Sequence, residues 1–249
     1  MMIKTTYTSW CRHRASVAIA VAMVTPSTSQ AAAADAGLVA ATVCPSWSGF
    51  STVGSVWEYR IGLFLVDGWE RWELTDLDIE TGSITVSVTG ERATDAYVYS
   101  YDREDFLLCD EEGLWSVGWT ITWNISDPFG HFSADADSID EWSDVQPVLP
   151  ADPMDGDIWT PSSGANLYRS TSDIDRDKST GIAAYTLVVG AREEDDVLGE
   201  TRVLLPILRY YREDPESGFQ DSYTTWYAED IGMVRRDDLI LTDFTPGTP

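Results

Sequence analysis

The stretch from Trp115 to Ile125, WSVGWTITWNI, alternates large apolar side chains with small or polar ones at every second position. A period of two over this length is typical of a half-buried β-strand and rules out an amphipathic helix. The face that carries Trp115, Trp119 and Trp123 must turn away from water, so the chain has to build a sheet with one apolar side. This stripe has two interpretations, a packed core or the wall of a cavity that binds a ligand.

Similar patterns recur along most of the chain, and no segment of the sequence shows a convincing helical period of apolar residues. Val56–Val66 and Trp69–Leu74 flank Asp67-Gly68, which is a strong hairpin signal. These patterns predict an all-β protein with an almost wholly antiparallel sheet of long, curved strands. Further strands are expected over 83–89, 96–101, 181–190, 197–212, 223–229, 231–234 and 239–244.

Residues 126–179 differ from the rest because Asp, Ser, Pro and Gly dominate them. We expect a long acidic connection here, either an excursion over one end of a barrel or a linker between two domains. The single-domain interpretation is preferred, since each half alone has few strands with which to close a core. The expected organisation is one β domain over 54–245, with a flexible segment over 35–53 before it and a tail over 246–249.

Residues 1–34 contain the three regions of a secretory signal peptide. Lys4, Arg12 and Arg14 charge its start, and Ala15–Val24 follows as an uninterrupted run of small and apolar residues. This run is shorter than the roughly 20 residues that a transmembrane helix needs, and no later stretch is long and apolar enough. We therefore expect an exported protein, periplasmic or extracellular, without a transmembrane segment.

The acidic charge of the chain and its scarcity of histidine exclude several kinds of partner and of catalytic chemistry. There are 42 Asp and Glu against 16 Lys and Arg, which gives a formal net charge of −26. Nucleic acid needs a basic footprint, so it is not expected as a partner. The two histidines are His13, inside the expected signal peptide, and His131. A catalytic triad needs a base beside its nucleophile and catalytic zinc needs several ligands, so we do not expect an enzyme.

Two cysteines, Cys44 and Cys109, follow the expected signal peptide. An exported chain enters an oxidising space, where such a pair is usually bridged, so a disulfide is predicted. By the chain-entropy estimate, closing a loop of this length adds roughly 4 kcal/mol to the stability. The alternative is a pair of independent buried thiols.

Asp173, Asp175 and Asp177 place an acid at every second position of one segment. Alternate Asp residues in a loop can direct their oxygens to one hard cation, so calcium is the candidate metal and no other cofactor is expected. The segment does not match an EF-hand, because Lys178 stands where that loop has Gly and Ala184 where it has Glu. The alternative is a solvated acidic loop.

Motifs spread over residues 54–244 carry a resemblance to a known family. Taken together in their order along the chain, these motifs resemble secreted bacterial proteins of the TapB-like group. Most members of that group have no assigned activity. The group is itself similar to the lipoprotein-carrier (LolA/LolB-like) half-barrels. The resemblance implies a strongly curved antiparallel sheet, a half-barrel or open barrel with an apolar concave face. It supplies no catalytic residues. The motifs are GSVWEY at 54–59, VLPADP at 148–153 leading into GDIW at 156–159, GETRVLLP at 199–206 and TWYAEDIGMV at 225–234.

These observations favour a non-enzymatic exported β-protein that binds a lipid or other apolar ligand, or a partner protein of the cell envelope. Trp115, Trp119 and Trp123 are the candidate ligand-binding residues if their stripe lines a cavity. One alternative is an extracellular protein that binds or hydrolyses carbohydrate through its tryptophans and carboxylates. Another is a purely structural component of the envelope.

Overall fold

The computed structural model describes residues 44–63, 66–127, 129, 133–160, 166–172, 178–212 and 221–248. The expected signal peptide over 1–34, the candidate calcium ligands Asp173, Asp175 and Asp177, and His131 lie outside the described residues. Within the described part of the chain, no helix is long and apolar enough to cross a membrane.

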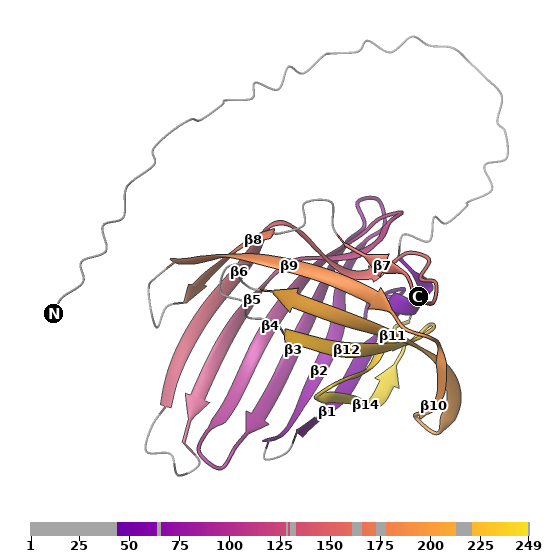
Figure 1. Cartoon of the computed structure of the whole chain (residues 1–249). Helices are drawn as coiled ribbons and strands as arrows, with labels where there is room; N and C mark the ends of the chain where they lie inside the picture. The colour runs from indigo at the N-terminus through magenta and orange to yellow at the C-terminus, as the bar shows by residue number, and fades with distance from the viewer. Residues whose placement is uncertain are drawn as a thin grey trace, which may run out of the picture. The chain divides into compact units, whose positions relative to one another are not determined.

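Among the described residues, the regular structure consists of fourteen antiparallel strands and one short 3-10 helix (Figure 1). The helix η1 spans Ser46–Ser48 and precedes all of the strands. The strands are β1 (Val56–Leu63), β2 (Val66–Asp78), β3 (Ser83–Ala93), β4 (Val98–Cys109), β5 (Gly113–Ser126), β6 (Ser133–Pro150), β7 (Ile158–Trp159), β8 (Asn166–Ser172), β9 (Lys178–Val189), β10 (Glu193–Val197), β11 (Glu200–Arg212), β12 (Asp221–Ala228), β13 (Gly232–Arg236) and β14 (Leu239–Thr245).

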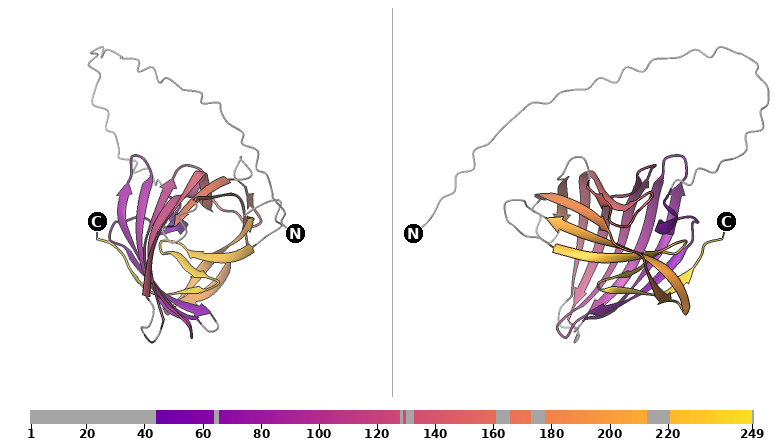
Figure 2. Two further views of the ribbon diagram at one scale, coloured as in Figure 1. Left: turned by 90° about the vertical axis from the view of Figure 1, so that its left-hand side faces the viewer. Right: turned by 45° about the vertical axis from the view of Figure 1, so that its right-hand side comes forward.

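The strands form one sheet that curls back on itself (Figure 2). Its order runs β10-β11-β12-β13-β14-β1-β2-β3-β4-β5-β6-β8-β9-β7, and β9 also pairs with β11. Twelve of the strands are thereby nearly closed into a barrel with one unsealed seam. The predicted all-β, strongly curved antiparallel fold is confirmed. Pairing is shortest at two places in the described part of the chain, with two residue pairs each: β13 with β14, through Arg235↔Ile240 and Arg236↔Leu239, and β7 with β9.

The acidic region 126–179 does not remain a connection, because β6, β7 and β8 lie within it. β6 pairs with β5 along most of its length and with β8 on its other edge. Ala134 and Ala136 stand opposite Ile125 and Trp123 in this register. Small residues thus alternate with acidic ones in the first part of β6, which gives it the period of two of a strand. The many acidic residues make the same segment resemble a loop in the sequence.

Inward positions of the strands supply the core. In β3, Ile84, Val86 and Val88 are fully buried, as their alternation predicts. Burying an aliphatic side chain of this size stabilises the fold by about 1.5–3 kcal/mol. β2 and β4 flank β3 on either side in antiparallel pairing; the register with β4 is regular, and that with β2 shifts once, between Leu74 and Asp76.

A disulfide joins Cys44 to Cys109, which confirms the predicted bridge. Their Cα atoms lie 5.1 Å apart, and 65 positions of sequence separate them. The bridge fastens the segment before β1 to the end of β4. Residues 44–53, which include η1, belong to the described structure; the rest of the segment 35–53, which the sequence predicts to be flexible, lies outside it. Gly49 packs against the backbone of Ile231, where a Cβ atom would lie 2.2 Å from the carbonyl oxygen.

Candidate functional site

The barrel interior contains a cavity of about 290 Å³. Its wall combines residues from both halves of the chain, because β2 to β6 face β9 and β11 to β13 across the interior. Eight side chains of the described lining are aromatic: Phe50, Trp57, Tyr59, Trp72, Trp119, Tyr185, Tyr223 and Tyr227. Such a lining favours a ligand with a flat or apolar portion.

The predicted stripe of tryptophans is split by a β-bulge at Val117. Ser116 pairs with Leu107 and Gly118 with Phe106, so Val117 is an extra residue that reverses the faces of β5 on either side of it. Trp119 therefore lines the cavity together with Ser116. The prediction that Trp115 shares this face is wrong.

Trp115 and Trp123 occupy different surroundings from Trp119. Trp115 packs against Trp159 of β7, with 4.5 Å between ring centroids, and donates a 3.0 Å hydrogen bond to Asp110. Trp123 packs against Tyr101 at 5.3 Å and borders a second hollow of about 230 Å³. The structure thus brings only Trp119, of the three candidate ligand-binding residues, to the large cavity.

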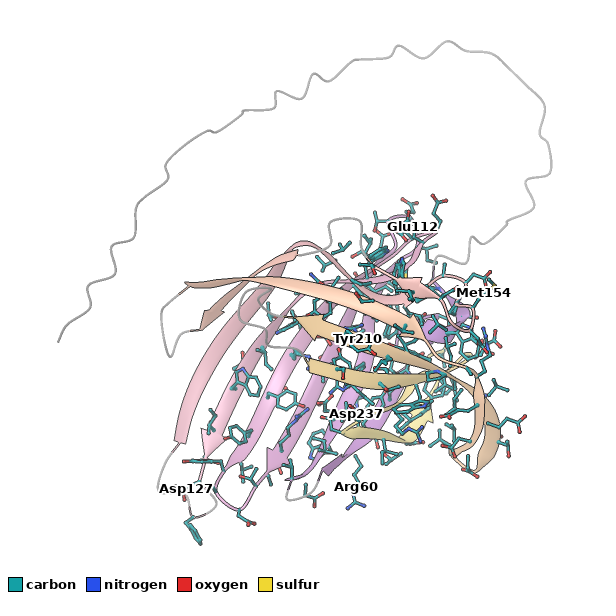
Figure 3. All side chains as sticks on the ribbon, in the orientation of Figure 1. Arg60, Glu112, Asp127, Met154, Tyr210 and Asp237 are labelled. Carbon is teal, nitrogen blue, oxygen red and sulfur yellow. A yellow bond between two sulfur atoms is a disulfide. The ribbon has the colours of Figure 1, made fainter. Side chains whose placement is uncertain are left out.

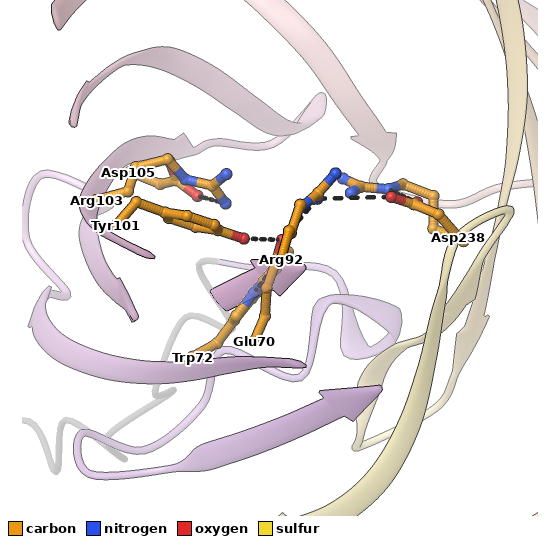
Figure 4. A network of polar contacts seen from close by, with 8 residues as sticks. Glu70, Trp72, Arg92, Tyr101, Arg103, Asp105 and Asp238 are labelled. Atoms are coloured by element: carbon orange, nitrogen blue, oxygen red, sulfur yellow. Dashed lines mark hydrogen bonds and ion pairs between the residues drawn. The ribbon is translucent and has the colours of Figure 1, made fainter. Parts of the chain in front are cut away.

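Glu70 is the centre of a paired polar network inside the barrel, which we call the Glu70 cluster and define as Glu70, Trp72, Arg92 and Tyr101 (Figure 4). Glu70 is 1% exposed and accepts hydrogen bonds from Trp72 at 2.8 Å, from Arg92 at 3.0 Å and from the Tyr101 hydroxyl. Burial by itself raises the pKa of Glu70. Arg103 and the hydrogen bonds outweigh burial and hold that pKa below its ordinary value.

Two further ion pairs lie next to this cluster. Arg92 is 3.5 Å from Asp238, which also accepts a 3.1 Å hydrogen bond from Arg236. On β4, Arg103 holds Asp105 through two contacts, at 2.8 and 2.9 Å. Burial raises the pKa of Asp105, although Arg103 acts in the opposite direction. Arg103, Asp105 and Arg236 all line the cavity, so its wall is charged as well as aromatic.

Arg209 stands in a different environment, which we call the Arg209 site and define as Arg209, Gln146, Tyr185 and Tyr223. The guanidinium lies 5.7 Å from the ring centroid of Tyr185 and 5.5 Å from that of Tyr223. It donates a 3.0 Å hydrogen bond to the carbonyl of Pro147. Among the described residues, no carboxylate lies within ion-pair distance of it. Cation–π contacts, the Tyr223 hydroxyl and one carbonyl therefore hold this arginine in place.

Gln146 reaches the cavity from β6, directly opposite Ser116 of β5. Its side chain is 1% exposed, yet neither the amide nitrogen nor the amide oxygen has a hydrogen-bond partner within the described structure. An unpaired buried amide costs about 1–3 kcal/mol. The Gln146 side chain therefore lowers the stability of the fold while it lines the cavity.

The sign of charge inside the barrel is opposite to that of the whole chain. Three arginines, Arg103, Arg209 and Arg236, line the cavity, with Asp105 as the one carboxylate in the described lining. The complete chain has a formal charge of −26. On the outer face, the side chains of Arg60 and Asp67 are 73% and 81% exposed, and Arg60 points away from the barrel (Figure 3). A positive interior within an acidic protein concentrates anions there.

The described part of the chain contains no candidate metal site. No group of three or more His, Cys, Asp or Glu side chains is placed there to hold a metal ion. The proposed calcium ligands fall outside the described residues. Calcium binding by that segment therefore stays a prediction.

Arg209 and Gln146 are the functional residues that the sequence patterns do not single out. One signal was available, since Leu205, Ile207 and Arg209 occupy alternate positions of β11 and the first two are fully buried. Period two thus places Arg209 on the inner face. The pairing of β9 with β11 and of β5 with β6 then brings Arg209 and Gln146 to the same cavity.

No family model, curated protein or solved structure matches this chain. The resemblance to the TapB-like and lipoprotein-carrier proteins therefore stays a prediction.

Proposed function

We propose that this protein is a non-enzymatic, exported binding protein whose barrel interior holds a small ligand with an apolar portion. The observation that carries the proposal is the cavity of about 290 Å³ with eight aromatic side chains in its wall. This volume lies near the lower end of the range for small-molecule sites, about 300–1,000 Å³. It has room for roughly ten groups the size of a water molecule.

Binding rather than hydrolysis is supported by the state of Asp105. Glycoside hydrolysis requires a carboxyl group that is free to donate a proton or attack the sugar. Arg103 instead holds Asp105 through two contacts. Asp105 therefore serves to fix an arginine at the wall of the cavity.

Export is supported by two independent features. Residues 1–34 have the composition of a signal peptide. The Cys44–Cys109 disulfide is of the kind that persists in oxidising compartments. A periplasmic or extracellular binding protein combines both features.

Titration with 1-octanol, a small neutral amphiphile, tests the proposed function. We expect a change in tryptophan fluorescence and measurable binding heat, because Trp57, Trp72 and Trp119 line the cavity. Ser116→Trp fills the cavity and should abolish binding. Ser87→Trp is the matched control, since Ser87 lies between the inward residues Val86 and Val88 and faces outward.

Two results would overturn the proposal. One is no binding to the wild-type protein at millimolar 1-octanol, with cellobiose binding in its place, which would favour the carbohydrate alternative. The other is equal binding by the wild type and a folded Ser116→Trp variant. If Ser116→Trp does not fold, Trp119→Phe supplies the test, because it changes the cavity wall and must change the affinity.

A further inference from the structure

We propose that the ligand is a small monocarboxylate and that Arg209 and Gln146 bind its carboxylate group. The inference rests on the proposed function, because it assigns a chemical class to the ligand of the same cavity. Three observations carry it: the environment of Arg209, the unpaired amide of Gln146 and the balance of charges inside the barrel.

Arg209 is arranged as an anion-binding group before any ligand arrives. Tyr185 and Tyr223 flank its guanidinium, and one of its donors is fixed on the carbonyl of Pro147. The remaining N–H groups of the planar guanidinium can donate to the two oxygens of a carboxylate. Each other arginine of the interior that we described is already paired with a carboxylate. Arg209 thus differs from its neighbours in having this capacity to spare.

Gln146 adds a second donor to the same part of the wall. Arg209 bonds to the carbonyl of Pro147, the residue that directly follows Gln146, so the two side chains approach the cavity from adjoining positions. The amide nitrogen of Gln146 is buried and has no partner in the part of the chain that the structure describes. A carboxylate oxygen would accept from it and remove the cost of leaving it unpaired. An alkyl or aromatic group alone would leave that amide as it is.

The interior charges leave room for one negative charge. The described cations are Arg92, Arg103, Arg209 and Arg236, and the described carboxylates that pair with them are Glu70, Asp105 and Asp238. Four positive charges against three negative ones leave a remainder of +1. A monoanion neutralises that remainder, whereas a phosphate dianion would exceed it. This favours a carboxylate over a phosphate.

The rest of the wall indicates what the carboxylate is attached to. Trp57, Trp72 and Trp119 face the same cavity, together with the aliphatic side chains of Val86 and Leu114. These surfaces suit an alkyl chain or a single ring. A medium-chain fatty acid such as octanoate combines such a body with a single carboxylate.

Calorimetric titration of the wild type with octanoate and with 1-octanol tests the inference, because the two ligands share an apolar chain and differ in charge. We expect octanoate to bind at least about tenfold more tightly, as charge-assisted hydrogen bonds are worth that much. In Arg209→Met this preference should disappear while 1-octanol still binds. Arg60→Met is the matched control, because Arg60 is 73% exposed on the outer face, and it should keep the wild-type preference.

Three results would overturn the inference while leaving the proposed function intact. These are equal affinity of the wild type for the two ligands, an unchanged preference in Arg209→Met, and tighter binding of octyl phosphate than of octanoate. Failure of both ligands to bind would instead overturn the proposed function as well. If Arg209→Met does not fold, Gln146→Glu replaces it in the test. A carboxylate at position 146 should lower the affinity for octanoate at least about tenfold and leave the affinity for 1-octanol unchanged.

Discussion

The Glu70 cluster and the Arg209 site occupy one barrel interior, yet they handle buried charge in opposite ways. Glu70 accepts three hydrogen bonds, one of them from Arg92, which also contacts Asp238. Arg209 faces two tyrosine rings and one backbone carbonyl, and beside it the Gln146 side chain has no hydrogen-bond partner among the described residues. In the first region the polar groups satisfy one another, whereas in the second the buried amide of Gln146 has no partner within the described structure.

This difference separates a structural role from a binding role. A buried charge with a complete set of partners stabilises one arrangement of the strands and resists change. A buried polar group without partners costs stability, so its presence at a cavity wall points to a ligand. The same account predicts that changes in the Glu70 cluster destabilise the fold, and that changes in the Arg209 site mainly affect binding.

The largest expected effect is that of Glu70→Gln. It removes the charge that Arg92 and the hydroxyl of Tyr101 contact, and it places an amide N–H₂ against groups that donate. We expect a loss of about 3 kcal/mol in the free energy of unfolding, at the lower end for a broken buried pair because Arg92 keeps Asp238. Urea denaturation measures it. The control Glu73→Gln, in an exposed pair with Arg71, should change stability by less than about 1 kcal/mol, and equal losses would contradict the comparison.

Acidification should act on the same cluster. The folded-state pKa of Glu70 lies below its ordinary value of about 4.3, so its contribution is present above that value and is lost as the pH falls through the folded pKa. The pKa of Asp105 is raised, so its contribution has the opposite sign and fades as the pH rises through the folded value. Denaturation of the wild type between pH 3 and 6 should show that the free energy of unfolding falls toward the acid end of this range. Glu70→Gln should flatten that part of the curve, and an unchanged slope would argue against Glu70.

Gln146→Leu should produce the reverse of the Glu70 result. Leucine has a similar volume and no polar atoms, so the substitution removes an unpaired amide from a buried position. We expect the free energy of unfolding to rise by about 1–3 kcal/mol in the absence of ligand, while octanoate binding weakens. Thermal and chemical denaturation measure the first effect. Destabilisation by the leucine would show that the amide serves the fold.

Arg209→Met should have the smallest effect on stability. Methionine keeps the apolar contacts with Tyr185 and Tyr223, and the loss of a buried charge offsets the loss of the bond to Pro147. We expect the free energy of unfolding to change by about 1 kcal/mol or less. A loss as large as that of Glu70→Gln would make Arg209 a second structural centre and remove the distinction between the two regions.

Local patterns in the sequence were sufficient for the elements whose burial follows from alternation. Ile84, Val86 and Val88 face inward as predicted. The expected hairpin of β1 and β2 forms, but its turn is not at Asp67-Gly68: both residues lie inside β2 and pair with Gly62 and Ile61, because Leu63 already pairs with Val66. The disulfide follows from the number of cysteines and the expected compartment. The overall fold class could be predicted because such periods recur through most of the chain.

Features that depend on register could not be predicted in the same way. The bulge at Val117 moves Trp115 to the other face, and it shows only in how β5 aligns with β4. Gly118 next to it is the one local hint, since a glycine inside a strand often marks a bulge. Arg209 and Gln146 lie 63 positions apart (209 − 146), and only the pairings of β9, β11 and β6 with their neighbours place both at the cavity.

A crystal structure of the protein with 8-bromooctanoate tests the central claim most directly, because the anomalous signal of bromine locates the chain of the ligand. The account predicts carboxylate oxygens about 2.7–3.2 Å from the Arg209 guanidinium and from the Gln146 amide nitrogen, with the bromine among the aromatic side chains of the cavity. Bromine on the outer face of the barrel, or a carboxylate in the cavity without a contact to Arg209, would contradict it.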